Sequence, residues 1–245
     1  MRLYRGEGGD SEEDSSIRCR LAATRRDYLG AFGLIYRRYL SAGLITPNAY
    51  GLRIAPHQLS RECLVVLAER RGEIVGTVSL IADGETLLPM DRLFPIPMNR
   101  LRDRGMRLVE IGCLASVADE EGYRSAIYVE LTRAAIQIAR DRGCERMIAA
   151  VHPRHARFYV RAMGFRRLSG PVRDPRVNGH AAVCVCGDPS REDAYAEPWR
   201  ELFFRNAGER FDSRTSRLPE RDRRLFRDTL DAIHAREVRP NRGAA

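Results

Sequence analysis

A single carboxylate, Glu110, opens the otherwise apolar run EIGCLASV at residues 110–117. If this run is a strand, alternation places Glu110 on one face with Leu108, Gly112 and Leu114, away from water. An ionised carboxylate there is costly unless it is paired with a cation or used in a reaction. Because desolvation raises the pKa of a carboxyl group, Glu110 could serve as a base near neutral pH. The alternative is a buried ion pair with an arginine.

Other residue types that carry chemistry lie close to this run or follow it. Cys113 could act as a nucleophile, but no basic residue adjoins it, so a thiolate role is not expected. His152 and His155 fall at a predicted strand end and in the next helix, and two such histidines do not by themselves form a metal site. The six cysteines include no C-x-x-C pair. We therefore expect no resident metal.

The elements that must position these residues follow from hydrophobic periodicity. Apolar runs bounded by turn residues predict a hairpin and five further strands, at residues 62–83 and at 16–24, 107–117, 144–151, 165–172 and 180–186. Apolar spacing of three to four residues predicts helices at residues 25–44, 123–143 and 153–163. The proline-containing segment 83–106 reads as a long linker. Strands separated by helices predict an α/β fold, a mixed sheet with helices on both faces.

The chain is expected to form one domain with two tails. Residues 1–16 are acidic and rich in Gly and Ser and are predicted to be disordered, whereas residues 17–189 carry the periodic strands and helices. Residues 190–245 contain two amphipathic segments and are predicted to form a C-terminal helical appendage. An apolar stripe that starts at Trp199 could pack within the chain or across a dimer, so the oligomeric state is left open.

The net charge of +9 is carried by arginine, because all 42 basic residues are arginine. Such a surface suits an acidic or phosphate-bearing partner. The arginines are spread along the chain, and neither a recognition helix nor an aromatic-basic platform is visible, so nucleic acid is not the expected partner. No apolar run is long enough to cross a bilayer and no secretory signal is visible, so we expect a cytoplasmic protein.

Three stretches of the sequence carry a resemblance to a known superfamily: FGLIYRRYLSAGLI, LLPMDRLFPIPMNRLRDRGMRLVEIGCLAS and AAVHPRHARFYVRAMGF. With the element order, they resemble the GNAT acyltransferases, and among these the long-chain N-acyl amino acid synthases and the related acyl-homoserine lactone synthases. The resemblance covers residues 17–187. It implies a GNAT-like, mostly antiparallel sheet. It also implies transfer of a fatty acyl group from acyl carrier protein to a small-molecule amine, usually that of an amino acid.

The resemblance also implies roles for individual residues around the bound thioester. Aminolysis of a thioester needs a base, which Glu110 would supply, and donors for the oxyanion. The acyl-pantetheine would lie along the strand of Glu110, where Gly112 allows a bulge and the amides of Cys113, Leu114 and Ala115 could hold the carbonyl oxygen. Tyr159 would take the position of the general acid. Its alternative is an aromatic side chain packed under its helix.

One departure from the superfamily pattern concerns the acyl donor. Members that use CoA carry a glycine-rich loop whose amides cradle the pyrophosphate. Here the corresponding segment reads ADEEGYRSA at residues 118–126, with one glycine and carboxylates that would repel a diphosphate. The single phosphate of a carrier-bound phosphopantetheine could still be accepted by Arg124 and the helix start near Ser125. No tightly bound cofactor is expected beyond this phosphopantetheine-linked donor, with acyl-CoA as the second option.

Recognition of the acceptor carboxylate calls for an arginine fork. Arg37 and Arg38 in the first helix and Arg92 in the linker are the candidates, and the apolar residues of the linker could line an acyl tunnel. Two other functions stay open. One is a CoA-dependent GNAT N-acetyltransferase, and the other is a non-catalytic GNAT-like protein that binds an acyl ligand or nucleic acid.

Overall fold

The computed structural model describes residues 16–117, 121–204 and 218–237, apart from the side chains of residues 121–124 and 236–237. The N-terminal segment that is predicted to be disordered lies outside this part of the chain, except for its last residue.

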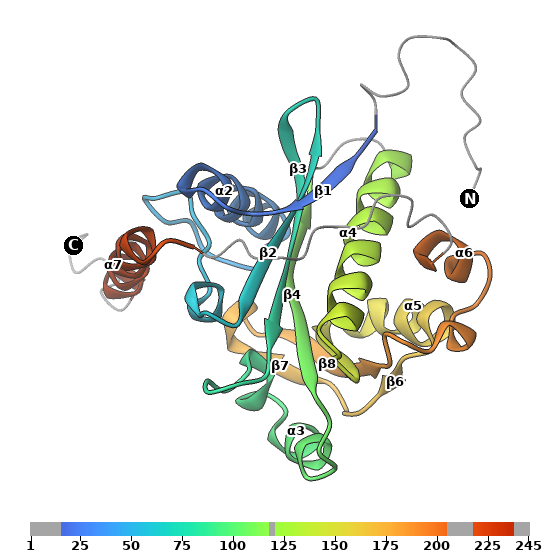
Figure 1. Ribbon diagram of the computed structural model, residues 1–245. Coiled ribbons are helices and arrows are strands. Elements are labelled where there is room, and N and C mark those ends of the chain that lie inside the picture. Colours follow the sequence, from blue (N-terminus) through green and yellow to red (C-terminus); the bar gives the residue numbers. More distant parts are fainter. Residues whose placement is uncertain (1–15, 118–120, 205–217, 238–245) are drawn as a thin grey trace, which may run out of the picture.

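An eight-stranded mixed sheet forms the middle layer of the described chain (Figure 1). The strands follow the order β1-β2-β3-β4-β5-β8-β6, and the short β7 pairs with β8. All neighbours are antiparallel except β4 and β5, which are parallel. The strands are β1 (Arg18–Leu21), β2 (Cys63–Arg70), β3 (Glu73–Ala82), β4 (Leu108–Ser116), β5 (Arg146–Val151), β6 (Arg166–Arg167), β7 (Val172–Asp174) and β8 (His180–Gly187). The mixed, mostly antiparallel sheet that we predicted is therefore confirmed.

Helices cover both faces of this sheet. The helices are α2 (Arg25–Ser41), α3 (Pro95–Arg102), α4 (Glu121–Asp141), α5 (Pro153–Met163), α6 (Trp199–Phe204) and α7 (Glu220–Glu237), with short 3-10 turns η1 (Pro56–Leu59), η2 (Pro89–Asp91), η3 (Pro175–Val177) and η4 (Glu192–Ala194). Figure 1 shows α2 and α7 on one side of the strands and α4, α5 and α6 on the other. Each side packs its own apolar core against the sheet. The prediction of helices on both faces is confirmed.

Local sequence signals account for the start of α2 and for both ends of α5. Thr24 caps α2 in a capping box with Asp27, in which each side chain accepts a backbone N–H of the other residue. Pro153 takes the first position of α5, where the missing amide hydrogen is not needed. Gly164 ends α5 with a φ of 64°, a left-handed conformation that glycine adopts without strain.

Residues 83–106 do not form the open linker that their prolines suggested. Pro89 and Pro95 instead start η2 and α3. Arg102 of α3 then joins two carboxylates, with its Nε 2.7 Å from an oxygen of Asp83 and its Nη2 2.7 Å from an oxygen of Asp91. The apolar residues of the segment fill the core on the α2 side of the sheet: Leu88, Met90, Phe94, Met98 and Leu101. The segment is thus a fixed part of the domain.

The two C-terminal helices pack on opposite faces of the sheet. Trp199 of α6 meets Phe158 of α5 edge to face, with ring centroids 4.7 Å apart. Phe226 of α7 meets Phe32 of α2 in the same way at 5.2 Å. The apolar stripe that starts at Trp199 therefore packs within the chain, and the division of the chain at residue 190 stays a prediction. In the described part of the chain, no helix combines the length and apolar character needed to span a membrane.

Candidate active site

The parallel strands β4 and β5 diverge after a short paired stretch. Pairing runs only from Leu108 with Arg146 to Glu110 with Ile148, whereas β4 continues to Ser116 along β3. Beyond Glu110, the edge of β4 that would face β5 therefore has no strand partner among the residues that the structure describes. This opening belongs to a cavity of about 1610 Å³.

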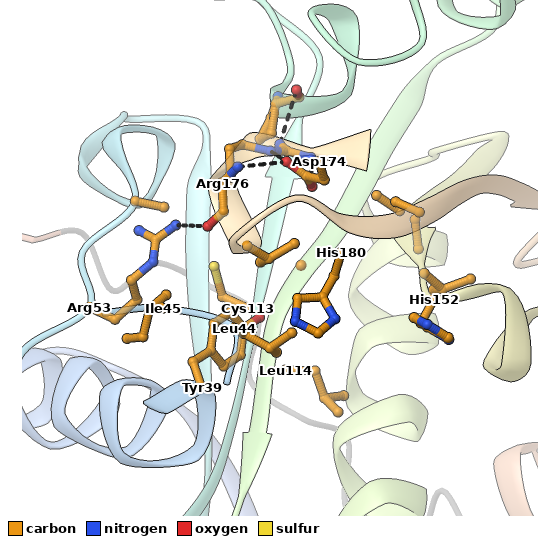
Figure 2. Close-up of a pocket in the computed structure, with 18 of the residues that line it drawn as sticks. Tyr39, Leu44, Ile45, Arg53, Cys113, Leu114, His152, Asp174, Arg176 and His180 are labelled. Carbon is orange, nitrogen blue, oxygen red and sulfur yellow. Dashed lines mark hydrogen bonds and ion pairs between the residues drawn. The ribbon is translucent and has the colours of Figure 1, made fainter. Parts of the chain in front are cut away.

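The cavity is lined from both helical layers, so it passes through the sheet at the divergence of β4 and β5 (Figure 2). Tyr39 of α2 and the turn η1 contribute from one layer, and Tyr128 of α4 and Tyr159 of α5 contribute from the other. Figure 2 shows Arg53 and Tyr39 close to Cys113 on one side of the cavity and His152 on the other. Much of the wall is apolar: Leu44, Ile45, Leu52, Ile54, Leu93, Leu114 and Phe158. Such a cavity suits a largely apolar ligand with a few polar groups.

Glu110 lies on the wall of this cavity at the last β4–β5 pair, and only 4% of its surface is exposed. Its Oε2 accepts the backbone N–H of Met90 at 2.9 Å. Burial raises the pKa of Glu110 from 4.5 to about 8, although the Met90 hydrogen bond and the charge of Arg176 oppose the rise. Among the described residues, no arginine lies within ion-pair distance of Glu110. The geometry therefore favours the proton acceptor over the buried ion pair.

The amide that holds Glu110 is itself fixed by the proline-containing segment. Around η2, Asp91 accepts the backbone N–H of Leu88, two residues before Met90, at 2.7 Å. Arg102 holds Asp91 in turn through a hydrogen bond of 2.7 Å. Because each contact is buried or partly buried, the carboxylate of Glu110 is held in one orientation toward the cavity.

The bulge in β4 falls at Cys113, one residue after the glycine that the sequence suggested. Cys113 has a φ of 52°, and Val78 of β3 faces two β4 residues, because the register shifts between Thr77 and Ser79. Gly112 lines the cavity, and its φ lies outside the left-handed range. A Cβ atom added there would meet nothing within 4 Å. The position of Gly112 therefore keeps space open in the cavity.

The bulge also reverses the alternation of side chains along β4. Cys113 and Ala115 pack with Leu108 on the α2 side, whereas Leu114 packs on the side of α4. The expectation that Leu114 shares a face with Glu110 is therefore wrong, since one extra residue moves it to the opposite face. Ala115 is 4% exposed and does not line the cavity with its side chain.

Cys113 lines the cavity next to Glu110, but its environment does not favour a thiolate. Burial raises the pKa of its thiol, and the charges of Arg53 and Arg176 only oppose this rise. Among the described residues, no basic side chain forms a hydrogen bond with its sulfur. The thiol is therefore not a suitable nucleophile, and a role for the backbone amides of this stretch stays a prediction.

Tyr159 lies on the cavity wall in α5 and is also part of an aromatic cluster. Its ring packs against Phe165 at 5.6 Å and Phe158 at 6.0 Å. Burial raises the pKa of Tyr159, while a hydrogen bond with Tyr128 opposes the rise. A phenol with a raised pKa keeps its proton at neutral pH, so Tyr159 can both pack and donate a proton.

The predicted acceptor arginines fall in different places. Arg92 is exposed and lines the cavity, but Arg37 and Arg38 of α2 do not, because Tyr39 is the residue that α2 turns toward it. Besides Arg154 at the start of α5, the structure adds Arg53 and Arg176, which the sequence does not single out. Arg53 lies in the irregular segment before η1 and Arg176 in the short turn η3, and neither segment has a periodicity that points to a site.

Arg53 and Arg176 differ in whether the guanidinium group already has a carboxylate partner. Arg176 forms an ion pair with Asp174 at 2.7 Å and donates to the carbonyl of Pro89 at 3.1 Å. Arg53 donates to two backbone carbonyls, those of Ile54 at 2.9 Å and Arg176 at 3.4 Å (Figure 2). Within the described residues it has no carboxylate partner. Of these two, Arg53 is therefore the better able to bind an anionic group, while Arg92 and Arg154 also line the cavity without an ion pair among the described residues.

The residues predicted to hold the donor phosphate are only partly described. Ser125 in α4 is exposed and lines the cavity. Arg124 belongs to the first turn of α4, but its side chain lies outside the described part, as do residues 118–120 of the loop before it. The phosphate assignment to Arg124 and Ser125 thus stays a prediction.

His152 and His155, two of the five histidines that line the cavity, make local contacts in α5. His152 caps α5 by accepting the backbone N–H of Arg154 at 3.3 Å, and His155 accepts from the Arg154 side chain at 3.1 Å. In the part of the chain that the structure describes, no group of three or more His, Cys, Asp or Glu side chains could hold a metal ion.

Comparison with known proteins connects this architecture to a family. The family model described as N-acyl amino acid synthase FeeM matches residues 30–188. A search of curated proteins gives no sequence match. The structure of FeeM, an N-acyl amino acid synthase from uncultured soil microbes, is similar at a TM-score of 0.64 and 18% identity, over 74% of this chain and 96% of FeeM.

Two further structures share the architecture. TofI, solved in a ternary complex with an inhibitor and MTA, gives a TM-score of 0.55 at 18% identity, over 71% of this chain and 91% of TofI. The CoA-dependent acyl-homoserine lactone synthase MesI gives 0.54 at 18% identity, over 78% of this chain and 96% of MesI. At these identities the likeness shows the fold, and the GNAT-like fold predicted from the sequence is confirmed.

Proposed function

Because the chain belongs to the FeeM family of N-acyl amino acid synthases, and is therefore an N-acyltransferase, we propose that it moves a long-chain acyl group from acyl carrier protein to the amine of an amino acid. One observation carries the proposal: a carboxylate with a pKa of about 8 lies on a largely apolar cavity that passes between β4 and β5. A thioester from the α5 side and an amine from the α2 side would meet beside it. Because this family consists of enzymes, the alternative of a non-catalytic GNAT-like binding protein is not retained.

In the proposed reaction Glu110 is the base. The neutral amine nitrogen attacks the thioester carbonyl carbon and forms the C–N bond, while its surplus proton passes to the carboxylate directly or through one water molecule. Backbone amides of Cys113, Leu114 and Ala115 are the proposed donors to the oxyanion, and the open edge of β4 supports this for those amides that point toward β5. The low dielectric around the buried Glu110 strengthens both interactions.

Breakdown of the tetrahedral intermediate releases the thiol. The C–S bond breaks, and the pantetheine sulfur takes a proton for which Tyr159 is the proposed donor, supported by its place on the cavity wall and its raised pKa. The proton gained by Glu110 returns to solvent or to Tyr159, so the cycle consumes no net proton. The products are an amide and a free thiol.

A stripe of arginines on α5 supports acyl carrier protein as the donor. Arg154, Arg157 and Arg161 are exposed and spaced at three and four residues, so they share one face of the helix. Among the described residues, none of the three forms an ion pair. The same helix begins at the cavity, which His152, Phe158 and Tyr159 line. An acidic carrier docked on this face would deliver its phosphopantetheine arm to the cavity.

Charge reversal on this face is expected to weaken the use of the carrier-bound donor. In an Arg157→Glu/Arg161→Glu variant, KM for acyl carrier protein should rise by about tenfold or more, because rim charges act on docking. KM for a short acyl-pantetheine should stay unchanged. Steady-state kinetics with both donors at low and high salt check this. Arg221→Glu/Arg227→Glu, on the exposed face of α7, is the matched control; equal losses in both double variants would contradict docking on α5.

The donor and acceptor classes can be tested with purified protein. Incubation with palmitoyl acyl carrier protein and a mixture of amino acids is expected to give N-palmitoyl amino acids by mass spectrometry. Palmitoyl-CoA should give slower turnover. Faster turnover with a CoA donor would move the assignment to a CoA-dependent acyltransferase, as MesI is described to be. An acylated amine that is not an amino acid would contradict the acceptor class.

A further inference from the structure

The C-terminal helix α7 supplies part of the cavity wall, although it begins well beyond residue 188, where the family match ends. Leu230 and Ile233, each 6% exposed, and the more exposed His234 line the cavity. We propose that this α7 wall contacts the far end of the acyl chain and limits its length. The inference rests on the proposed acyl transfer and adds a specificity element to it.

The α7 wall is anchored firmly enough to discriminate between ligands. Phe226, 1% exposed, packs against Phe32 of α2 with ring centroids 5.2 Å apart and against Tyr28 at 6.3 Å. At the start of the helix, Arg223 is 8% exposed and donates to the carbonyl of Leu218 at 3.2 Å. The apolar residues 226, 230 and 233 thus follow helical spacing and fix one face of α7 to the domain. A helix held in this way cannot yield freely to a longer ligand.

The cavity has a polar region around Glu110, and its side chains differ in character from the buried side chains of the α7 wall. Glu110, Arg176 and Arg53 form one polar region, since the charge of Arg176 acts on Glu110 and Arg53 contacts the Arg176 carbonyl at 3.4 Å. The buried residues that α7 adds, Leu230 and Ile233, are aliphatic. Aliphatic side chains bind methylene groups, not an amine or a carboxylate.

The position of α7 relative to the reacting group agrees with contact at the end of a long chain. Figure 1 shows α7 at the outer edge of the α2 layer, whereas β4, which carries Glu110, runs through the middle of the molecule. The turn η1 packs against α7, and its Pro56 and His57 line the cavity as well. A thioester held at β4 would therefore have to extend its chain past η1 to reach Leu230 and Ile233.

Variants of the α7 wall test this directly. Leu230→Trp and Ile233→Trp are expected to shift the preferred donor toward shorter chains, and a Leu230→Ala/Ile233→Ala variant toward longer ones. Each methylene group that no longer fits should lower kcat/KM about fourfold, which is the effect of about 0.8 kcal/mol per buried methylene. The readout is kcat/KM for a series from decanoyl to octadecanoyl acyl carrier protein, together with competitive binding of the corresponding free fatty acids.

Leu225→Trp is the matched control, because Leu225 lies on the same helix, is 36% exposed and does not line this cavity. It should leave the chain-length profile unchanged. The inference is overturned by an equal loss at every chain length in the folded tryptophan variants, or by a changed amino acid preference with an unchanged chain-length profile. If the wild type forms no amide but the fatty-acid binding profile still shifts with α7, the proposed function fails and the α7 wall stands.

Discussion

The Glu110→Gln variant is expected to lose about 10²- to 10⁴-fold in kcat, the range associated with the loss of a positioned general base. Gln keeps the size of the side chain and an oxygen that can accept the Met90 N–H, but it cannot take the proton of the amine. Since the cavity wall is unchanged, KM for donor and acceptor should change little. Steady-state kinetics with the acyl carrier protein donor give both values.

The pH dependence separates this role from a structural one. With the pKa of Glu110 at about 8, the wild-type rate should rise as pH increases through about 8, because only the ionised carboxylate accepts a proton. The acceptor amine also loses its proton at higher pH, and this raises the rate as well. The variant should keep only the part of the pH–rate profile that is due to the amine. A pH–rate profile of both proteins with one amino acid measures the difference. A limb near pH 8 of equal size in the variant would contradict the assignment to Glu110.

The same pKa shift predicts the stability of the variant and provides its folding control. Glu110 has a raised pKa in the folded state, so its contribution to the free energy of unfolding is fully present below about pH 4.5 and falls as pH rises to about 8. Gln carries no such dependence. The variant should therefore be at least as stable as the wild type above this window, and denaturant unfolding on both sides of the window tests it. Unfolding of the variant at neutral pH would instead indicate that the carboxylate is structural.

The Arg53→Ala variant is expected to raise KM for amino acids by about 10- to 100-fold with little change in kcat. Arg53 lines the cavity without a carboxylate partner among the described residues, and a charge-assisted hydrogen bond to the acceptor carboxylate is worth about 1.5–3 kcal/mol. The effect should disappear for an amine that lacks the carboxylate. Kinetics with phenylalanine and with phenethylamine, in wild type and variant, isolate that one interaction.

Two further variants control this experiment. Arg53→Lys keeps the charge but loses the planar fork, so its effect should be intermediate. Arg37→Ala removes an exposed arginine of α2 that lies outside the cavity, and it should leave both KM values unchanged. An equal rise in KM for phenylalanine and phenethylamine in Arg53→Ala would assign Arg53 to the structure of its loop, where it contacts the Ile54 carbonyl, and not to the acceptor.

The fold could be predicted from the sequence wherever short-range patterns decide it. Alternation predicts β2 and β3 around a turn, and helical spacing with Pro153 and Gly164 gives the observed limits of α5. The segment at residues 83–106 could not be predicted in this way. Its order depends on Arg102 reaching Asp83 and Asp91, contacts over 19 and 11 residues that no local pattern encodes.

In the candidate site too, only the residues marked by a local sequence pattern could be predicted. Glu110 stands out in the sequence because a carboxylate in an apolar strand is unusual, and the structure gives it a buried place at the divergence of β4 and β5. The side-chain directions after Gly112 could not be predicted, because the bulge at Cys113 reverses the alternation. Arg53 was missed because it lies in an irregular segment, where only tertiary contacts decide which of 42 arginines reaches the cavity.

Mass spectrometry of lipid extracts from cells that express the wild type or the Glu110→Gln variant tests the central claim most directly. We predict new long-chain N-acyl amino acids with the wild type, and a strong reduction with a variant that is present at the same level and folded. Extracts of wild-type cells without any new amide would contradict the proposed reaction. Equal amounts of amide from both proteins would keep the reaction and contradict Glu110 as its base.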